Sequence, residues 1–401
     1  MNYLLTGAEF NNKGAEAMTL VALKNIYGYD KEAKVYMMYF GKYPEFDLKK
    51  EVIFFEVSTY QIENMLGKLS KYFLRDRIKD FIKAFIPWKK SLFWQYRKAK
   101  NILKSIDVAI DISGFSFSSK WGDADTIEFS NKLLLMKKYG AKVYLMPQSF
   151  GPYDYEDSSV LKYGLSALNL CDKIFAREKT GYDSLIKFGL TNVEYCPDSV
   201  LIEEDFNPMI LLKNKNSLER IDFKNEHNVA IVPNYRLIDR GGYNSKRLMD
   251  TYSIIIEELL DSYTVYLIAH AGEDLELCKK IKNMYTNEPN VILVDHVMLS
   301  YNYENACKNF DFVIGARYHA IVHAYKQGTP ALVLGWADKY QDIMCLLKQE
   351  RYLLDYTDSK RVLDLLKIME KEYRNENKII ESNLKIIQNK DCYKVIAGEK
   401  A

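Results

Sequence analysis

The sequence predicts an α/β protein of two doubly wound domains, each with a parallel sheet covered by helices on both faces. Three observations support this prediction. At 401 residues the chain is longer than a single typical core requires. Short apolar runs alternate with helical patterns along both halves, as in βαβ units. The alternation stops once, in a polar segment near the middle, and then restarts, which indicates two Rossmann-like domains facing a cleft.

The first domain is predicted over residues 1–205. Its strands are the short apolar runs, and its helices are the longer amphipathic stretches between them. The expected strands cover residues 3–5, 34–39, 52–55, 108–112, 142–146 and 173–176, and the expected helices cover 15–27, 62–85, 130–139 and 158–170. Strands that alternate with helices in this way form a parallel sheet.

Residues 206–228 are expected to link the domains, because they are polar, rich in lysine and asparagine, and contain Pro208. The second domain is predicted over residues 229–401. Its expected strands cover residues 229–232, 264–269, 291–294, 312–314 and 331–334, and its expected helices cover 245–260, 273–285, 303–308, 316–325 and 340–347. From about residue 360 we expect a tail of charged amphipathic helices, one of them free to pack back on the first domain.

Composition and charge narrow the class of protein. Hydrophobic residues make up 48% of the chain and charged residues 27%, as in ordinary globular proteins. The formal net charge of +2 gives no general attraction to nucleic acid, and we expect no such partner. The six cysteines are scattered, which suits buried thiols in a reducing compartment. No apolar run reaches about twenty residues, so we expect a cytoplasmic protein.

Residues 68–104 differ from the rest in charge, since lysine and arginine far outnumber Asp76 and Asp80 and aromatic residues lie between them. One interpretation is an amphipathic element on an anionic membrane surface, which would make the protein peripheral to the cytoplasmic membrane face. The other is a helix pair that packs on the core and exposes a solvated basic side. A nucleic-acid patch has no recognised motif to support it.

The strongest chemical signal follows the strand at residues 312–314. Arg317 and His319 come directly after it, at the start of a helix. In open α/β sheets, ligands bind at the carboxyl ends of strands, and phosphates bind at helix N-termini. This segment therefore predicts an anion site with a proton donor beside it. His323 lies one turn further along and is expected to be a core or capping residue.

The loop after the first strand carries Asn12, Lys13 and Gly14 and leads into a helix. A loop at this place often contacts the polar end of a ligand. It matches neither a dinucleotide fingerprint nor a P-loop. The alternative is a plain loop in which Asn12 caps the helix.

Two further loops are expected at the same edge of the sheet. Ser113 lies in a Ser-Gly turn after the strand at residues 108–112, and Gln148 and Ser149 follow the strand at residues 142–146. The last two side chains could donate hydrogen bonds to sugar hydroxyls. The alternative is that these residues only satisfy the turns.

Arg177 ends an apolar strand just before a helix, and Asp198 follows the next strand. The guanidinium group of Arg177 is suited to a carboxylate or a phosphate. The alternative is a structural ion pair with Glu178 or Asp198. Asp198 is thus either a base at the cleft edge or the group that holds Arg177 in place.

Other catalytic chemistries have little support. Among the five histidines only two have helical spacing, and no HExxH or DxD motif accompanies them, so we expect no metal. A GxSxG nucleophile elbow and a Ser-His-Asp order are also absent from the sequence.

The ordered set of these motifs resembles the polysaccharide pyruvyl transferases. The resemblance runs from about residue 2 to residue 347 and implies a GT-B-like fold without metal or other cofactor. The motifs that carry it are Asn12-Lys13-Gly14-Ala15-Glu16-Ala17, Ser113-Gly114, Gln148-Ser149-Phe150-Gly151-Pro152, Ala176-Arg177-Glu178, Pro197-Asp198 and Gly315-Ala316-Arg317-Tyr318-His319-Ala320-Ile321.

The resemblance implies an activity. Members of the family transfer the pyruvyl group of phosphoenolpyruvate to a sugar of a cell-surface polysaccharide or its precursor, forming a pyruvate ketal and releasing phosphate. Residues 1–205 are then the acceptor side and residues 229–401 the donor side. The resemblance places Arg317 and His319 in the donor motif and Arg177 in a second arginine motif. The partners it implies are phosphoenolpyruvate and a sugar acceptor, with a lipid-linked unit, a nucleotide sugar and a finished polymer as alternatives.

The residue types suit this chemistry independently. Phosphoenolpyruvate carries a phosphate and a carboxylate, which call for two cationic groups. Its methylene carbon must be protonated, and histidine is the natural acid near neutral pH. We expect His319 to donate that proton or to protonate the departing phosphate. The alternative is that His319 only hydrogen-bonds the phosphate.

Two other functions are compatible with these residues. The first is a glycosyltransferase of the same fold that uses a nucleotide sugar. Against it, the second domain has no clear acidic residue placed for the nucleotide ribose, although Glu273 or Asp295 could serve. A non-catalytic sugar-binding protein is the second, and the presence of both Arg317 and His319 argues against it.

Overall fold

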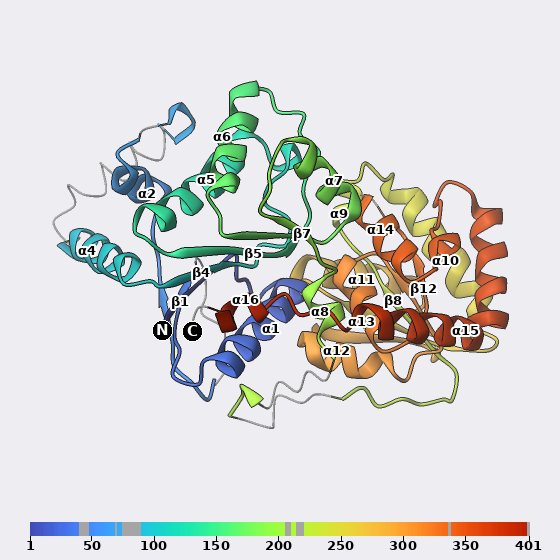
Figure 1. Ribbon diagram of the computed structural model, residues 1–401. Coiled ribbons are helices and arrows are strands. Elements are labelled where there is room, and N and C mark those ends of the chain that lie inside the picture. The colour runs from blue at the N-terminus through green and yellow to red at the C-terminus, as the bar shows by residue number, and fades with distance from the viewer. Residues whose placement is uncertain are drawn as a thin grey trace.

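The protein consists of two lobes, each built around one parallel sheet (Figure 1). The computed structural model describes residues 1–39, 48–68, 70–73, 90–204, 210–213, 220–335 and 338–398. The prediction of two doubly wound α/β domains is confirmed by the two sheets. Much of the basic segment at 68–104 and of the linker at 206–228 lies outside the described residues.

The sheet of the first domain has seven parallel strands in the order β3-β2-β1-β4-β5-β6-β7. The strands are β1 (Asn2–Thr6), β2 (Lys34–Met38), β3 (Val52–Phe55), β4 (Val108–Asp111), β5 (Lys142–Gln148), β6 (Lys173–Ala176) and β7 (Val193–Tyr195). The strand order reverses between β1 and β4. Loops after these two strands therefore diverge at the carboxyl edge and leave the crevice in which such folds bind ligands.

Helices cover both faces of this sheet. They are α1 (Lys13–Tyr29), α2 (Thr59–Leu66), α4 (Lys90–Lys104), α5 (Asp123–Lys138), α6 (Ser158–Asn169), α7 (Lys179–Lys187) and α8 (Ser199–Ile202), with the 3₁₀ turns η1 (Lys71–Phe73) and η3 (Ser119–Trp121). Successive residues of β1 point to opposite faces, so Tyr3 and Leu5 belong to the core under α1 and Leu4 to the core under α2 and α5.

The sheet of the second domain has five parallel strands in the order β10-β9-β8-β11-β12, with the reversal between β8 and β11. Its strands are β8 (Asn228–Val232), β9 (Thr264–Ala269), β10 (Val291–Val297), β11 (Phe312–Gly315) and β12 (Ala331–Val333). Its helices are α9 (Arg236–Asp239), α10 (Ser245–Leu259), α11 (Gly272–Met284), α12 (Ser300–Cys307), α13 (Tyr318–Lys326), α14 (Asp338–Leu346), α15 (Ser359–Ile387) and α16 (Lys394–Ala397), with the 3₁₀ turn η6 (Glu350–Tyr352).

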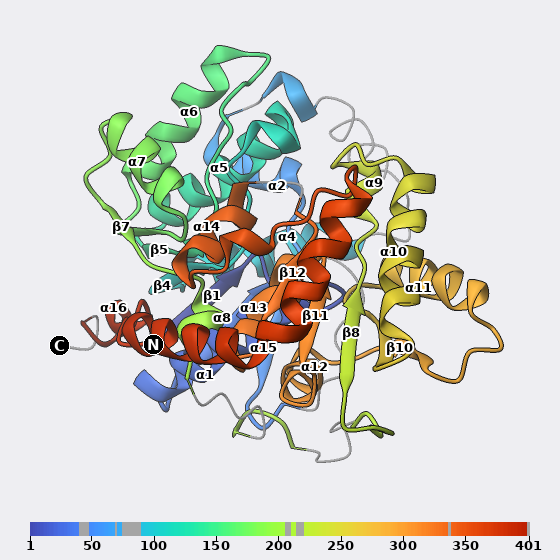
Figure 2. The ribbon, with the colours of Figure 1, turned by 90° about the vertical axis from the view of Figure 1, so that its right-hand side faces the viewer.

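The carboxyl-terminal tail returns to the first domain. Helix α15 crosses the second domain and leads to α16, which lies beside α1 (Figure 2). Lys390 Nζ donates a hydrogen bond to the carbonyl of Tyr195 (3.1 Å), and Tyr29 is hydrogen-bonded to Asp391. The tail thereby joins the two domains by a second route besides the linker.

The start of α1 is also attached to the second domain. Glu16 is buried and accepts hydrogen bonds from the backbone N–H (2.8 Å) and the hydroxyl (2.9 Å) of Ser300. Lys13 Nζ lies 2.5 Å from the same carboxylate, and its backbone N–H donates to the carbonyl of His270 (3.3 Å). These contacts fix the first loop against the second domain.

Helix boundaries differ from the prediction in several places. The helix expected at 62–85 is α2, which begins at Thr59 and ends at Leu66, and residues 74–89 lie outside the described residues. The helix expected at 130–139 begins earlier, at Asp123, because Gly122 ends the preceding turn. In the described part of the chain, no helix has the length and apolar character needed to cross a membrane.

Candidate active site between the domains

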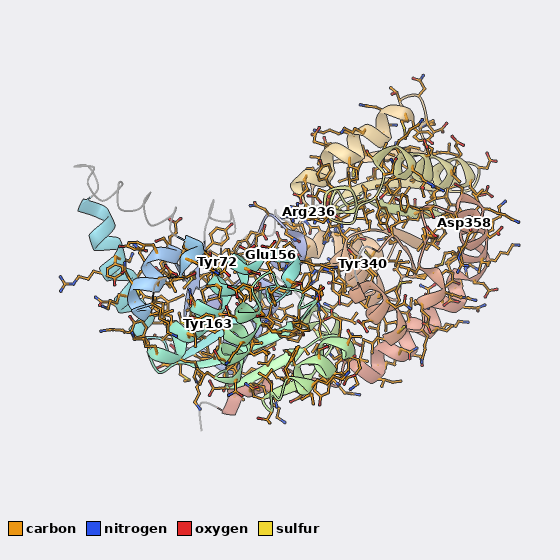
Figure 3. All side chains as sticks on the ribbon, turned by 90° about the horizontal axis from the view of Figure 1, so that it is seen from above. Tyr72, Glu156, Tyr163, Arg236, Tyr340 and Asp358 are labelled. Carbon is orange, nitrogen blue, oxygen red and sulfur yellow. The ribbon has the colours of Figure 1, made fainter. Side chains whose placement is uncertain are left out.

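A cavity of about 360 Å³ lies between the carboxyl edges of the two sheets. Both domains line it, and Arg236 and Tyr340, two of its lining residues, lie where the lobes meet (Figure 3). From the first domain it is lined by Gly7, Glu9, Asn11, Asn12, Ala15, Met18, Ser113, Gly114, Phe115, Trp121 and Arg177. From the second domain it is lined by Asn234, Arg236, Arg240, His270, Ala271, Glu273, Arg317, Tyr318, His319, Lys339 and Tyr340.

His319 lies in the first turn of α13 and faces this cavity with a side chain that is 12% exposed. Its Nε2 lies 3.4 Å from Asp198 Oδ2, an ion-pair distance without the alignment of a hydrogen bond. Asp198 also accepts a hydrogen bond from the backbone N–H of Val200 (2.9 Å) and thereby caps α8. The two domains therefore bring one imidazole and one buried carboxylate together.

The two groups affect each other's protonation. Burial lowers the pKa of His319, and although Asp198 opposes this effect, the pKa stays below its usual value. Burial acts to raise the pKa of Asp198, but His319 and Arg177 outweigh it and hold the pKa well below the usual carboxyl range. Near pH 7 the protein alone therefore has a neutral His319 beside an ionised Asp198.

Gly14 allows the imidazole to occupy this position. A Cβ atom added at Gly14 would lie 2.2 Å from His319 Nδ1, far inside van der Waals contact. The start of α1 thus packs directly against the ring of His319. Asn12 lines the cavity and its side chain accepts a hydrogen bond from the N–H of Gly14 (3.0 Å), so it also caps α1.

Arg177 lines the cavity but is engaged by protein groups. Its Nη1 donates to Asp198 Oδ2 (2.9 Å), and its Nε donates to Glu178 Oε1 (2.7 Å) and to Ser149 Oγ (3.0 Å). The guanidinium group also lies over the ring of Tyr318, 4.3 Å from its centroid. Both ion pairs that the sequence offered as alternatives are present, and Arg177 holds Asp198 in place opposite His319.

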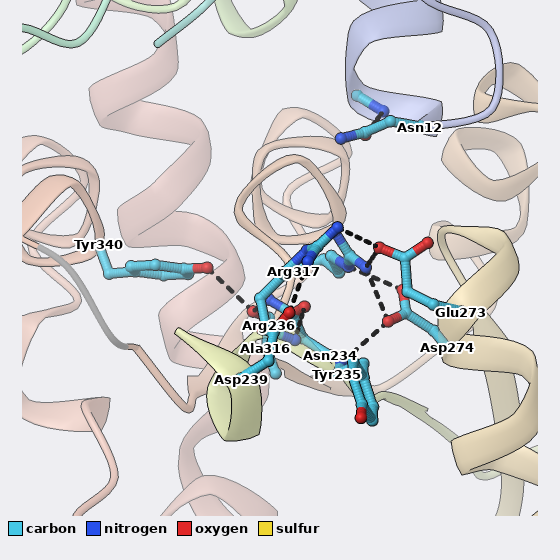
Figure 4. Close-up of polar contacts among 11 residues, drawn as sticks. Asn12, Asn234, Tyr235, Arg236, Asp239, Glu273, Asp274, Ala316, Arg317 and Tyr340 are labelled. Carbon is cyan, nitrogen blue, oxygen red and sulfur yellow. Dashed lines mark hydrogen bonds and ion pairs between the residues drawn. The ribbon is translucent and has the colours of Figure 1, made fainter. Parts of the chain in front are cut away.

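Arg317 is held by the start of α11 (Figure 4). Its Nε and Nη2 donate to the two oxygens of Asp274 (2.7 and 2.8 Å), and Nη2 also donates to Glu273 (2.9 Å). This fork-to-carboxylate geometry fixes the plane of the guanidinium group. Nη1 has no hydrogen bond to any residue that the structure describes. Asn12 lies across the cavity from Arg317 in this view.

The remaining predicted residues lie behind the cavity wall, with one exception. Ser113 lines the cavity, and its hydroxyl donates to Asp111 (2.9 Å). Gln148 is buried and its amide donates to the same carboxylate (3.3 Å), while Ser149 donates to Glu178 (2.8 Å). Gln148 and Ser149 therefore support Asp111 and the Arg177–Glu178 pair rather than the cavity surface.

Several lining residues were not predicted as site residues from the sequence. Lys339 lies in the first turn of α14, and burial together with the neighbouring Arg177 lowers its pKa to about 7. His270 follows β9, and its buried Nε2 has no hydrogen-bond partner among the described residues. Both lie after a strand and at or near a helix start, so the rule that found Arg317 would also have found them.

The described residues contain no group of three or more side chains arranged to hold a metal ion. The cavity instead gathers cations from both domains, namely Arg177, Arg236, Arg240, Arg317 and Lys339. Glu9 and Glu273 are its lining carboxylates, and Glu273 is already bound to Arg317. With the first turn of α13 beside it, the cavity is suited to a small molecule with more than one negative charge.

Comparison with known families decides the assignment. The family model of the polysaccharide pyruvyl transferases matches residues 12–338. The chain belongs to this family. The match covers both domains. It includes all the residues that line the cavity except Gly7, Glu9, Asn11, Lys339 and Tyr340. No curated protein matches the sequence significantly.

Solved structures establish the fold of this pyruvyl transferase family member as the GT-B type. UDP-GlcNAc 2-epimerase from Neisseria meningitidis bound to UDP-GlcNAc is 12% identical, with a TM-score of 0.58 and 99% of each chain covered. Anabaena HepE in complex with UDP is 12% identical, with a TM-score of 0.54, 99% of this chain and 97% of the other covered. S. aureus MnaA with UDP is 11% identical, with a TM-score of 0.54 and coverages of 95% and 90%.

Proposed function

We propose that this protein transfers the pyruvyl group of phosphoenolpyruvate to a sugar of a cell-surface polysaccharide or its precursor, forming a pyruvate ketal and releasing phosphate. Family membership supports the reaction class. The observation that carries the proposal is the His319–Asp198 pair, which lies at the edge of a cavity lined by several cations. A proton donor beside an anion site is what this reaction requires.

The negative charges of phosphoenolpyruvate match the groups that the second domain presents to the cavity. Asp274 and Glu273 bind Nε and Nη2 of Arg317 and leave its Nη1 for a ligand. The first turn of α13 offers backbone N–H groups as well, because its N-cap residue makes no side-chain capping bond. A phosphate at a helix N-terminus beside an arginine is a favourable arrangement. In this proposal the phosphate or carboxylate of phosphoenolpyruvate binds there.

His319 then supplies the proton. The negative charge of the bound donor opposes the effect of burial and raises the pKa of the imidazole, which converts neutral His319 into an acid. Its proton goes to the methylene carbon of phosphoenolpyruvate and leaves an oxocarbenium-like carbon at C2. Asp198 stabilises the imidazolium before transfer, because its carboxylate remains ionised.

Two sugar hydroxyls complete the reaction. The oxygen of the first attacks C2, and the oxygen of the second replaces the phosphate oxygen, so that two C–O bonds form and one breaks. The two hydroxyl groups lose one proton each. One of these protons balances the proton that His319 gave to the methylene carbon, and the other leaves with phosphate. Glu9 is the candidate base for the first hydroxyl, because it lines the first-domain wall and burial raises its pKa.

We further propose a lipid-linked acceptor and a position at the cytoplasmic membrane face. The support is the composition of residues 68–104, in which aromatic side chains lie among many basic ones. Charge reversal within this segment should reduce binding to vesicles of anionic lipid and leave transfer to a water-soluble acceptor unchanged. Equal vesicle binding by the reversed protein would contradict this part.

The test of the main proposal is phosphate release from phosphoenolpyruvate in the presence of candidate sugars, with the ketal methyl group followed by NMR. The rival is a nucleotide-sugar glycosyltransferase, which the UDP complexes of similar structures suggest. A parallel incubation with UDP-sugars separates the two. Acceptor-dependent phosphate release supports pyruvyl transfer, whereas UDP release without it supports the rival.

A further inference from the structure

A second cavity, of about 560 Å³, lies on the first domain. Its lining residues in the described chain come from α2, η1, α5 and α6, and Tyr72 and Tyr163 contribute aromatic side chains. Both tyrosines lie on the first lobe, whereas Arg236 and Tyr340 of the cavity between the domains lie where the lobes meet (Figure 3). The second cavity is therefore separate from the site assigned to the reaction.

The start of α5 connects the two cavities. Trp121 lines the cavity between the domains, and Asp123 follows two residues later. Asp123 Oδ2 accepts hydrogen bonds from the hydroxyl of Tyr72 (3.2 Å) and the backbone N–H of Asp157 (3.0 Å), and both of these residues line the second cavity. Two residues of chain span at most about 7 Å. A short chain of sugars that begins in the cavity between the domains can therefore reach the second one.

The second cavity has a hydrogen-bond donor without a partner. Asn131 lines it and is only 2% exposed. Its Oδ1 accepts a hydrogen bond from the hydroxyl of Tyr163 (2.6 Å), whereas its amide N–H groups donate to no residue that the structure describes. A buried donor of this kind is costly unless a ligand or water completes its bonds.

These groups suit a sugar. A pyranose ring has apolar C–H faces, which pack on aromatic rings, and hydroxyl edges, which bind a few fixed polar groups. Tyr72 and Tyr163 supply rings, Asn131 supplies an amide, and the carboxylate of Asp157 is held in place by Lys71 (2.8 Å). Lys71 also lies near the beginning of the basic segment at 68–104, so this cavity leads from the site toward that segment.

We propose that the second cavity binds a further sugar unit of the acceptor, next to the unit that receives the pyruvyl group. The inference rests on the proposed function and narrows its substrate to an oligosaccharide rather than a single sugar. The reacting unit then lies in the cavity between the domains, where the half-buried rings of Phe115 and Trp121, 5.4 Å apart, belong to the first-domain wall. The rest of the acceptor passes the start of α5.

The experiment fills the second cavity with a bulky side chain. Ser159 is exposed and lines this cavity, and Ser159→Trp removes one exposed hydrogen bond, to Asp157. Ser158→Trp is the matched control, because Ser158 is an exposed neighbour outside the lining. The full-length proteins are applied, without phosphoenolpyruvate, to a glycan array that carries single sugars and bacterial oligosaccharides.

The native protein and Ser158→Trp should retain the same oligosaccharides in preference to single sugars, and Ser159→Trp should lose them. No retained oligosaccharide, or equal retention by Ser159→Trp and the native protein, would overturn the inference. Circular dichroism establishes that each variant is folded. Retention on the array requires no pyruvyl transfer, so a loss specific to Ser159→Trp without acceptor-dependent phosphate release by the native protein would contradict the proposed function alone.

Asn131→Asp tests the same cavity through turnover. The variant keeps an oxygen for the hydroxyl of Tyr163 but loses the amide N–H groups. The ratio of kcat/KM for an oligosaccharide acceptor to kcat/KM for its terminal sugar alone should fall about tenfold, as expected for the loss of one hydrogen bond. An unchanged ratio would show that Asn131 does not bind the acceptor and would overturn the inference.

Discussion

Two histidine–carboxylate pairs lie one turn apart on α13 and differ in the origin of the carboxylate. His319 faces the cavity, and its partner Asp198 belongs to the first domain. His323 is buried, and its Nδ1 lies 2.7 Å from Glu304 on α12 of the second domain. Lys326 Nζ also lies close to this inner pair, 3.0 Å from Glu304 Oε1.

The difference separates a pair that depends on both domains from one that stabilises a single domain. Asp198 is held by Arg177 and by the cap of α8, so the pair with His319 forms only when the domains are joined. The Glu304 pair needs only α12 and α13. In the proposed function, equivalent residue types therefore serve the reaction at one end of the helix and the core at the other, and variants of the two pairs should differ accordingly.

The largest expected effect is that of His319→Gln. Loss of the proposed proton donor should lower acceptor-dependent phosphate release by about a thousandfold, within the range of general acid catalysis. The matched His323→Gln variant should keep most of its turnover and unfold at a lower temperature, because it leaves Glu304 partly unpaired. Near-normal turnover by His319→Gln would remove His319 from the mechanism.

Asp198→Asn should have the next largest effect. Asp198 raises the pKa of His319 against the effect of burial, so its loss should lower that pKa further and leave less imidazolium at neutral pH. Turnover should fall by roughly a hundredfold, and the pH at which activity declines on the alkaline side should move downward. Glu304→Gln is the control and should leave the pH profile in place. An unmoved profile in Asp198→Asn would show that the pair does not set the protonation of His319.

Gly14→Ala should displace the imidazole ring of His319 without changing a charge. The added Cβ would lie 2.2 Å from His319 Nδ1, so the ring or the start of α1 must shift. Turnover should fall by about tenfold to a hundredfold, as expected when a catalytic group is misplaced. Gly28→Ala lies in the same helix with no atom within 4 Å of its added Cβ and should be neutral or slightly stabilising. Equal activity of the two variants would contradict the assigned packing.

The last prediction concerns stability, which Lys339→Met should raise. The pKa of Lys339 is lowered from 10.5 to about 7, so between these values the unfolded chain binds a proton that the native state does not. Lys339 therefore costs stability, and the cost grows as the pH falls from 10.5 toward 7. Lys339→Met should unfold at a higher temperature than the native protein, with a larger difference at pH 7 than at pH 10. A lower unfolding temperature of Lys339→Met at pH 7 would contradict the lowered pKa of Lys339.

Much of this arrangement could be predicted because it depends on local pattern. The alternation of strands and helices predicted both sheets. The rule for strand ends placed Arg177 at the carboxyl edge of the first sheet, and Arg317 and His319 at the carboxyl edge of the second. The cap at Asn12 was recognisable from its place before a helix. These features need only neighbouring residues in the sequence.

The rest depends on distant packing. Asp198 is shared between Arg177 and His319, which lie in different domains, and no spacing encodes that contact. Gln148 was expected to face a sugar, but its strand continues through it and leaves its amide beside Asp111. Lys339 belongs to no recognisable sequence motif. Its pKa is lowered by burial and by Arg177, which is far away in the sequence.

The most direct test of the account is a crystal structure of the protein with phosphoenolpyruvate. We expect the donor to lie in the cavity between the domains, with a charged group on Arg317 and its methylene carbon facing His319. Donor bound outside this cavity, or bound within it with the methylene carbon turned away from His319, would contradict the central claim.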